Sequence, residues 1–380
     1  MEGMAPLRSA GNRFTGSKRR SDTLSMNNPL VQEAMAALWG VSDPSHFEPI
    51  SGGLINYSYC VTTQHNEKIF LQQINQVVFT HPDRIASNLQ LIYSALKEKN
   101  ATHLMARPLS FKNDAWLFCD SKGHFWRAAD FLSSKTLHHT TDLSTLQVAV
   151  QAFANFTTQL SDLNTDLLYP TLDNFHDLSL RFKQFQQAIG EGDQTRLAET
   201  SWLIEALQAR IGYVQLYRQM CEAPTDFKKR VMHHDAKLSN LLFDNRGQQV
   251  VAVTDLDTTM PGYFFSDLGD MIRSMAASVD ENNNHPDAVF ILPAAYETIF
   301  NCYRHTILNQ LTAAESSLLH AAGPLMIYMQ TLRFLTDYLQ GDHYYQIQRP
   351  GQNRERAEHQ FALLSSLEDL LEKKYQFSIA

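Results

Sequence analysis

Three polar residues in one short stretch of this chain have the types and the spacing that phosphoryl transfer requires. Asp235 is followed five residues later by Asn240, and Asp255 comes after a further apolar segment. A carboxylate can orient and deprotonate an acceptor hydroxyl, while an Asn and a second Asp can hold the magnesium ion that bridges nucleotide phosphates. We therefore predict that Asp235 is the catalytic base and that Asn240 and Asp255 are metal ligands.

These residues need an element that brings them together, and the sequence between them supplies one. Residues 241–243 and 250–253 are short apolar runs, and residues 244–247 between them carry a turn signal. A hairpin built from the two runs would place all three polar residues at its mouth. The alternative is a turn with a helix cap, which is the common meaning of an isolated Asp and Asn. The hairpin context favours the catalytic interpretation.

The rest of the chain predicts a β-rich first part and a helical remainder. Residues 29–39 have helical spacing, and residues 47–61 form a hairpin signal around a Ser-Gly-Gly turn. Residues 68–73 are the next expected strand. From residue 144 onward apolar residues recur every three or four positions, as in 178–189 and 202–217. We expect Asp267, Asp270 and Arg273 to cap and brace the helix that follows Asp255.

The segment from residue 233 to 273 resembles the aminoglycoside phosphotransferase superfamily, the small-molecule relatives of protein kinases. Residues 70–79, 261–273 and 332–364 further resemble the N-acetylhexosamine 1-kinases, and the resemblance runs from about residue 30 to the end. It implies an α+β, protein-kinase-like fold of two lobes. We expect a tail at 1–27, a small β-rich nucleotide-binding N-lobe at 28–130, and a larger, mainly helical C-lobe at 131–380 with the catalytic hairpin and the sugar site.

The resemblance also implies ATP as co-substrate and Mg²⁺ as cofactor. Glycines let backbone N–H groups approach an anion closely, and the family's nucleotide loop falls on the Ser-Gly-Gly turn. A hinge that receives the adenine is expected near residues 129–132, at a junction of lobes. The implied cofactor-binding residues are Ser51, Gly52, Gly53, Asn56, Gln72, Asp130 and Leu132.

One position departs from the wider superfamily pattern. Most members carry a lysine near the end of the 68–73 strand to pair the α- and β-phosphates, and this chain has Gln72 there. We interpret the change as a trait of the subfamily, which leaves Lys68 and Arg84 as candidates to neutralise the α-phosphate. A nucleotide-binding regulator without catalysis is an alternative hypothesis, against which the three intact polar residues argue.

The acceptor is the second substrate to be predicted. Arg333 and Tyr344 match sugar-contacting positions of the family, and together with Asp235 and Asp255 they form the expected substrate-binding set. Arginine supplies several fixed donors and tyrosine an aromatic face. The leading hypothesis is phosphorylation of the anomeric hydroxyl of N-acetylglucosamine, N-acetylgalactosamine or a related hexose. The alternative acceptors are choline, ethanolamine, homoserine or an aminoglycoside, which would need carboxylates or an aromatic cage.

Composition is that of an ordinary globular protein. The chain has 380 residues, enough for two lobes, with 44% hydrophobic and 19% charged residues. Its net charge of −8 argues against a general nucleic-acid binder. No apolar run is long enough to span a bilayer, and four scattered cysteines indicate reduced thiols rather than a disulfide framework. We expect a cytoplasmic enzyme without membrane or nucleic-acid partners, as a monomer or weak dimer.

The first 27 residues differ from the rest in composition. They contain Gly, Ser and a basic cluster at residues 18–20, with little hydrophobic periodicity. They lack the apolar core of a secretory signal. We expect a disordered tail, with Met26 as a natural beginning, and a basic docking or targeting arm as the alternative.

Overall fold

The computed structural model describes residues 28–38, 44–50, 55–281, 283 and 288–379. It divides into two compact units, one of residues up to 80 together with 108–131, and one of residues 81–107 together with 132–380. The predicted tail at 1–27 lies outside the described residues. No helix in the described part is long and apolar enough to cross a membrane.

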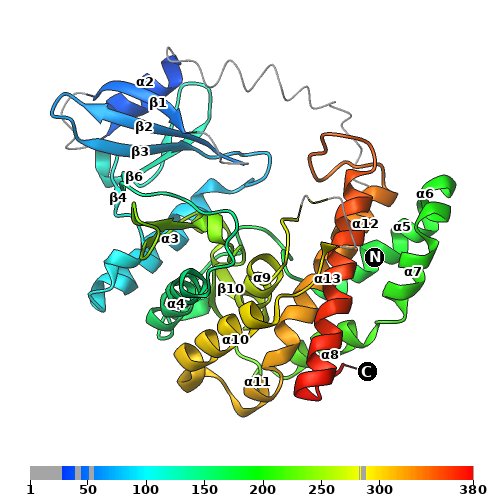
Figure 1. Cartoon of the computed structure of the whole chain (residues 1–380). Helices are drawn as coiled ribbons and strands as arrows, with labels where there is room; N and C mark the ends of the chain where they lie inside the picture. The colour runs from blue at the N-terminus through cyan, green and yellow to red at the C-terminus, as the bar shows by residue number, and fades with distance from the viewer. Residues whose placement is uncertain (1–27, 39–43, 51–54, 282, 284–287, 380) are drawn as a thin grey trace, which may run out of the picture. The chain divides into compact units, whose positions relative to one another are not determined.

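The first unit is an antiparallel sheet with one helix against it (Figure 1). The strand order is β1-β2-β3-β6-β4, and β5 pairs with β6. Alternate residues of the central strands, among them Tyr59, Leu71 and Trp126, are buried against the helix in one apolar core. The elements are α2 (Pro29–Ala37), β1 (Pro44–Ile50), β2 (Tyr57–Thr63), β3 (Lys68–Gln73), β4 (Pro108–Leu109), β5 (Phe118–Cys119) and β6 (Phe125–Asp130).

Side-chain hydrogen bonds fasten the end of this unit. The Asp120 carboxylate accepts hydrogen bonds from the backbone N–H groups of Lys122 and His124 and from the indole N–H of Trp126. Glu33 of α2 accepts two hydrogen bonds from Ser121, through its backbone N–H and its hydroxyl. The helix is thereby tied to the β5–β6 turn, and the hairpin predicted at 47–61 is confirmed as β1 pairing with β2.

The second unit is mainly helical, with two small antiparallel sheets of two strands each. Strands β8 and β9 pair with each other, and β10 pairs with β7. Its long helices are α3 (Pro82–Glu98), α4 (Leu143–Gln159), α5 (Leu178–Glu191), α10 (Pro293–Ile307), α12 (Ala322–Leu339) and α13 (Gln352–Tyr375). The shorter elements are α6 (Gln194–Glu199), α7 (Ser201–Gln208), α8 (Gly212–Glu222), α9 (Phe265–Met275), α11 (Ala313–Ser317), β7 (Arg230–Met232), β8 (Leu241–Phe243), β9 (Val250–Val253) and β10 (Met260–Gly262).

Helix α12 is the centre of this unit and packs against α13, α9 and α5 (Figure 1). Sixteen of its eighteen residues are buried, as expected for a central helix, and only Gln330 and Arg333 are partly exposed. Gly269 of α9 lies so close to α12 that an added Cβ would come within 2.4 Å of the Ala322 carbonyl oxygen. This close approach fixes α9 against α12, next to the residues that the sequence predicts to be catalytic.

Two features differ from the sequence prediction. Helix α3 lies within the range predicted for the N-lobe, but it belongs to the second unit. Its Ile92 and Leu96 are part of the larger core. The Asn88 amide of the same helix donates hydrogen bonds to the carbonyls of Tyr169 and Thr259. The helix expected over 202–217 is two helices, α7 and α8. The break precedes Gly212, a residue type that helix interiors disfavour.

Candidate active site

The loop after β7 carries Asp235, and two neighbours hold its carboxylate. The Asn240 amide Nδ2 donates to Asp235 Oδ2 at 2.7 Å and to the Asp235 carbonyl at 2.8 Å. The Lys237 ammonium lies 2.8 Å from the same carboxylate oxygen. Both contacts fix Oδ2 and neither involves Oδ1. The structure therefore brings Asp235 and Asn240 together, as the sequence predicts, and adds Lys237, which the prediction missed although it stands only two residues beyond Asp235.

The shape of this loop depends on Asp267 of α9. The backbone N–H groups of His233 and His234 donate to the two oxygens of the Asp267 carboxylate, at 2.9 and 2.8 Å. His234 has a φ of 66°, a conformation that a residue with a side chain adopts only when its surroundings enforce it. The expectation that Asp267 caps its own helix is therefore wrong. Its buried carboxylate instead braces the loop that presents Asp235.

A second set of hydrogen bonds joins this loop to the β8–β9 hairpin. The Asn240 carbonyl accepts from the Thr254 N–H at 3.0 Å, and the His233 imidazole Nε2 contacts the Thr254 carbonyl at 2.8 Å. The predicted hairpin is confirmed, with Leu241 opposite Val253. Asp255 follows at the open end of the hairpin. It is exposed, and its backbone has the left-handed conformation, with a φ of 58°. The hairpin thus places the residue before Asp255 directly beside Asn240.

The donor set suits a magnesium ion that is shared with phosphates. Because Asn240 donates its Nδ2 to Asp235, its Oδ1 points away from that carboxylate and could bind a metal, for which Asp255 could supply a second oxygen. Among the described residues, no group of three or more His, Cys, Asp or Glu could hold a metal by itself. Mg²⁺ is ordinarily bound by one or two protein oxygens, water and substrate phosphates, so these two residues fit a nucleotide-bound ion rather than an all-protein site.

Charge near Asp235 sets its protonation. Burial alone would raise the pKa of its carboxyl, but Lys237, His233 and the Asn240 amide together hold the pKa below its usual value. The nearby Asp270 behaves oppositely. Burial raises its pKa, and its Arg273 partner, with Nε 2.8 Å from Oδ1, offsets this only in part. Asp235 is therefore ionised at neutral pH and ready to accept a proton.

Arg333 of α12 lies among three aromatic rings. Its guanidinium carbon is 5.1 Å from the centre of the Phe175 ring, 5.6 Å from that of Tyr345 and 5.9 Å from that of Tyr344. Phe175 is also 6.3 Å from the His234 ring. The structure thus brings the two predicted acceptor residues, Arg333 and Tyr344, next to each other. The prediction missed Phe175, which is far from Arg333 in the sequence, and also Tyr345, although it stands next to the predicted Tyr344.

Several arginines surround the same place. The His176 imidazole stacks on Phe175 and contacts His234 through their Nδ1 atoms at 3.1 Å. Burial lowers the pKa of His176 well below its usual value, with further lowering by His234 and by Arg333, Arg181 and Arg273. Burial lowers the pKa of the neighbouring Arg181 guanidinium, and the charge of Arg333 lowers it further. The guanidinium groups of Arg333 and Arg181 therefore lie close together beside the catalytic loop, while Arg273 is paired with Asp270 and Glu281.

The structure describes two of the predicted nucleotide-binding residues near the Ser-Gly-Gly turn and on β3. Ser51, Gly52 and Gly53 lie outside the described residues. Asn56 is buried, and its Oδ1 accepts a hydrogen bond from the Asn75 N–H at 2.9 Å, which holds the chain after β3. Gln72 is buried on β3 and hydrogen-bonded to Ser58 and Arg127.

The two predicted hinge residues belong to different units. Asp130 ends β6, opposite Ile69 of β3. Leu132 begins the longer segment of the second unit, where its carbonyl accepts the Ser134 hydroxyl at 2.9 Å.

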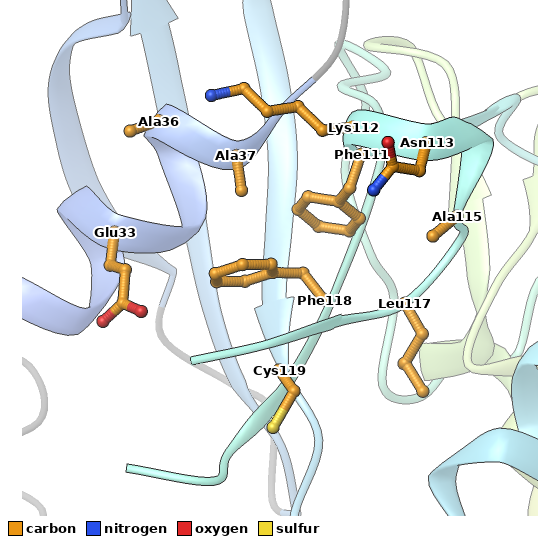
Figure 2. A pocket seen from close by; sticks show the side chains of 10 residues that line it. All are labelled: Glu33, Ala36, Ala37, Phe111, Lys112, Asn113, Ala115, Leu117, Phe118 and Cys119. Atoms are coloured by element: carbon orange, nitrogen blue, oxygen red, sulfur yellow. The ribbon is translucent and has the colours of Figure 1, made fainter. Parts of the chain in front are cut away.

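A pocket in the first unit contains none of the predicted site residues that the structure describes. It opens between α2 and the segment before β5, where the stacked rings of Phe111 and Phe118 form its wall (Figure 2). Ala36, Ala37 and Leu117 complete a largely apolar lining. The polar residues that the sequence associates with catalysis lie elsewhere, in the second unit.

Comparison with known proteins supplies the family. A model described as the phosphotransferase enzyme family matches residues 46–294, more than half of the chain. The fold is similar to a microcompartment-associated aminopropanol kinase, with 18% identity, a TM-score of 0.63, and coverage of 91% of this chain and 98% of that one. It is also similar to an aminoglycoside phosphotransferase from Alicyclobacillus acidocaldarius, with 12% identity, a TM-score of 0.59, and coverage of 95% and 100%.

A third similar structure is the amicoumacin kinase hAmiN in complex with AMP-PNP, Ca²⁺ and Ami. It shares 10% identity and a TM-score of 0.54, and the match covers 95% of this chain and 96% of that one. With the family match, a small antiparallel sheet in one unit and a larger, mainly helical second unit, the predicted α+β, protein-kinase-like fold is confirmed.

Proposed function

Because this chain belongs to the phosphotransferase enzyme family, we propose that it is an ATP- and magnesium-dependent kinase for the anomeric hydroxyl of an N-acetylhexosamine. N-acetylglucosamine and N-acetylgalactosamine are the acceptors that the sequence resemblance favours. The chemistry rests on the family and on the geometry around Asp235. The choice of acceptor rests on the resemblance and on the charge around Arg333.

In this proposal Asp235 orients the acceptor hydroxyl and accepts its proton. Asn240 and Lys237 hold Oδ2, so the acceptor would approach Oδ1. Phosphoryl transfer has a loose transition state, so positioning and charge neutralisation contribute more than base strength. The low pKa of Asp235 is therefore compatible with its role. Lys237 would place a positive charge next to the transferred phosphoryl group, whose oxygens carry the charge in the transition state.

Asn240 and Asp255 would hold the metal in this proposal. Bound there, Mg²⁺ would neutralise charge on the nucleotide phosphates. Asn240 is oriented by its hydrogen bonds to Asp235, and the Thr254 N–H holds the Asn240 backbone. Asn240, one of the two proposed metal ligands, is thereby held in a fixed relation to Asp235. A regulator without catalysis would have no use for this fixed relation, which argues against that alternative.

One observation supports the proposed acceptor class, namely the arginine side chains beside the catalytic loop. Arg333 lowers the pKa of both His176 and Arg181, so at least two guanidinium groups lie close together there. A cationic acceptor would be repelled by them, and the aromatic rings that could form a cage for it already surround Arg333. A neutral sugar avoids this repulsion, and an acetamido carbonyl could accept hydrogen bonds from a guanidinium.

The test is acceptor-dependent ADP release with Mg-ATP. The panel contains N-acetylglucosamine, N-acetylgalactosamine, glucosamine, galactose, choline, aminopropanol and an aminoglycoside, and phosphorus NMR locates the phosphate on the product. We expect turnover with an N-acetylhexosamine and a phosphate on the anomeric carbon. Turnover confined to the cationic acceptors would overturn the acceptor assignment and leave the kinase chemistry intact.

A further inference from the structure

One face of the first unit's sheet carries a polar cluster. Ser58 of β2 lies directly opposite Gln72 of β3, and Gln72 lies directly opposite Arg127 of β6. Side chains at directly paired positions share a face of the sheet. The next positions, Tyr59, Leu71 and Ala128, are buried in the core under α2. The polar cluster therefore occupies the face that is turned away from α2.

Gln72 is held at both ends of its amide. Its Nε2 donates to the Ser58 hydroxyl at 2.8 Å, and its Oε1 accepts from Arg127 Nε at 2.9 Å and from a second guanidinium nitrogen. Gln72 itself has no charge. Its effect is to orient a guanidinium at the position where most members of the superfamily have a lysine on this strand.

We propose that Arg127 is the cation that contacts the nucleotide phosphates in this chain and that Gln72 is the residue that positions it. The positive charge is then retained on the same face of the sheet but is supplied by β6 instead of β3. This inference rests on the proposed ATP-dependent function. It identifies the residue that replaces the lysine, which the sequence alone left unassigned.

The two cations suggested by the sequence fit this role less well. Lys68 is on β3, but four residues before Gln72, or about 13 Å along an extended strand. Its ammonium lies 5.7 Å from the centre of the Phe131 ring. Arg84 belongs to the second unit, where its Nη1 donates to the Pro170 carbonyl at 3.2 Å and lies 3.8 Å from the Asp173 carboxylate.

A guanidinium has chemical properties suited to phosphate binding. It is charged at every pH that the protein meets, and its fork of N–H donors can contact two phosphate oxygens at once. Its long side chain loses conformational freedom when it binds, which reduces the gain. The contacts with Gln72 pre-orient the guanidinium plane and so reduce this cost.

The test compares the binding of ADP and of adenosine by isothermal titration calorimetry, with magnesium present. The variants of the full chain are Arg127→Gln, Arg127→Lys, the double variant Gln72→Lys with Arg127→Gln, and Lys112→Gln as a charge-matched control on an exposed residue of the same unit. Adenosine lacks phosphates, so it reports whether the nucleoside site is still formed.

We expect Arg127→Gln to weaken ADP binding about tenfold or more and to leave adenosine binding unchanged. Arg127→Lys should fall between this variant and wild type, and the double variant should recover part of the loss. Lys112→Gln should bind both ligands like wild type.

An equal loss of ADP and adenosine binding would show a purely structural role and overturn the inference, as would wild-type ADP affinity in Arg127→Gln. If Arg127→Gln does not fold, Arg127→Lys provides the test. A ratio of ADP affinity to adenosine affinity equal to that of wild type would then overturn the inference. Failure of the wild-type protein to bind ADP at all would instead overturn the proposed function.

Discussion

The Lys237 ammonium and the Asp235 carboxylate are 2.8 Å apart and belong to the same loop, separated by one residue. Asn240 contacts the same carboxylate oxygen, so a cation and an amide share Oδ2 of the proposed base. Such an arrangement both orients the carboxylate and keeps it ionised. It also makes the separate contributions of the two side chains measurable.

Replacing the base is the first prediction. Asp235→Asn keeps the size of the side chain and removes the proton acceptor. We expect kcat to fall by about two to four orders of magnitude, the usual contribution of a positioned base, with little change in ADP binding. Turnover would be followed by ADP release and binding by calorimetry. Near-normal turnover in this variant would show that Asp235 is not the base.

Replacing the cation next to the base is the second prediction. In Lys237→Met the attraction that opposes burial is lost, so the pKa of Asp235 should rise. Activity should then be lost at a higher pH as the solution is acidified than in wild type, and kcat should fall because a charge near the phosphoryl group is missing. The measurement is kcat/KM from pH 4 to 8, with Lys228→Met, an exposed residue before β7, as the control. An acid limb at the same pH in both variants would contradict the coupling.

The Asp267 contact to the catalytic loop gives a third prediction. The two carboxylate oxygens of Asp267 each accept a hydrogen bond from one backbone N–H group. In Asp267→Asn one of these N–H groups would face an NH₂ group instead of an oxygen. We expect a loss of about 1–3 kcal/mol in the free energy of unfolding, the cost of a buried donor left without its acceptor. We also expect lower kcat because the His234 conformation would relax. Urea unfolding and turnover measure the two effects.

A matched control for this variant lies in the β8–β9 turn. Asp244 also accepts backbone hydrogen bonds, from the N–H groups of Gln248 and Gln249, but it is less buried. Asp244→Asn should therefore destabilise the protein less and leave kcat unchanged. Equal effects of the two substitutions would mean that Asp267 has no special connection with the catalytic loop.

The sequence predicts most of the local structure around Asp235, for a physical reason. The hairpin, its turn and the helix after it are short-range features, and their residues lie within about 40 positions of each other. Strand β3 and the hairpin strands were predicted with their observed bounds because apolar runs end at clear turn signals.

Contacts between distant segments could not be predicted in the same way. Phe175 meets Arg333, and Arg127 meets Gln72, only because the fold brings separate elements together. Asp267 was assigned to its own helix because a carboxylate in a first helical turn is usually favourable there. In the structure the Asp267 carboxylate instead accepts hydrogen bonds from the backbone N–H groups of His233 and His234, which lie more than thirty residues earlier in the chain. Neither periodicity nor spacing carries a signal for such pairs.

Arg333 gives the fourth prediction, which concerns the acceptor. Arg333→Gln removes the charge and most donors but keeps a hydrogen-bonding amide. We expect the KM for the N-acetylhexosamine to rise about tenfold or more, the effect of a lost hydrogen bond to a charged group, with the KM for Mg-ATP unchanged. The exposed Arg304→Gln on α10 is the control. A rise in the KM for ATP instead would place Arg333 outside the acceptor site.

Histidines that are buried in the neutral form give the last prediction, on pH and stability. Burial lowers the pKa of both His234 and His320 to about 4, from an ordinary value of 6.5. The unfolded chain therefore takes up protons on these residues between pH 6.5 and 4, where the folded protein does not. Their contribution to stability is complete above pH 6.5 and is lost as the pH falls towards 4. For the fully buried His234 the loss is at most about 3 kcal/mol.

His320 allows this to be tested away from the catalytic loop. It stacks on Phe300, with ring centres 4.0 Å apart, and its Nδ1 contacts the Tyr296 hydroxyl at 2.6 Å. His320→Gln cannot titrate in this range, so the variant should lose less stability than wild type between pH 7 and 4.5, even though it is less stable at pH 7. Comparing the two proteins by urea unfolding isolates this residue, because buried carboxylates such as Asp267 and Asp270 are common to both. Parallel curves would mean that His320 takes up its proton equally in the folded and unfolded chains.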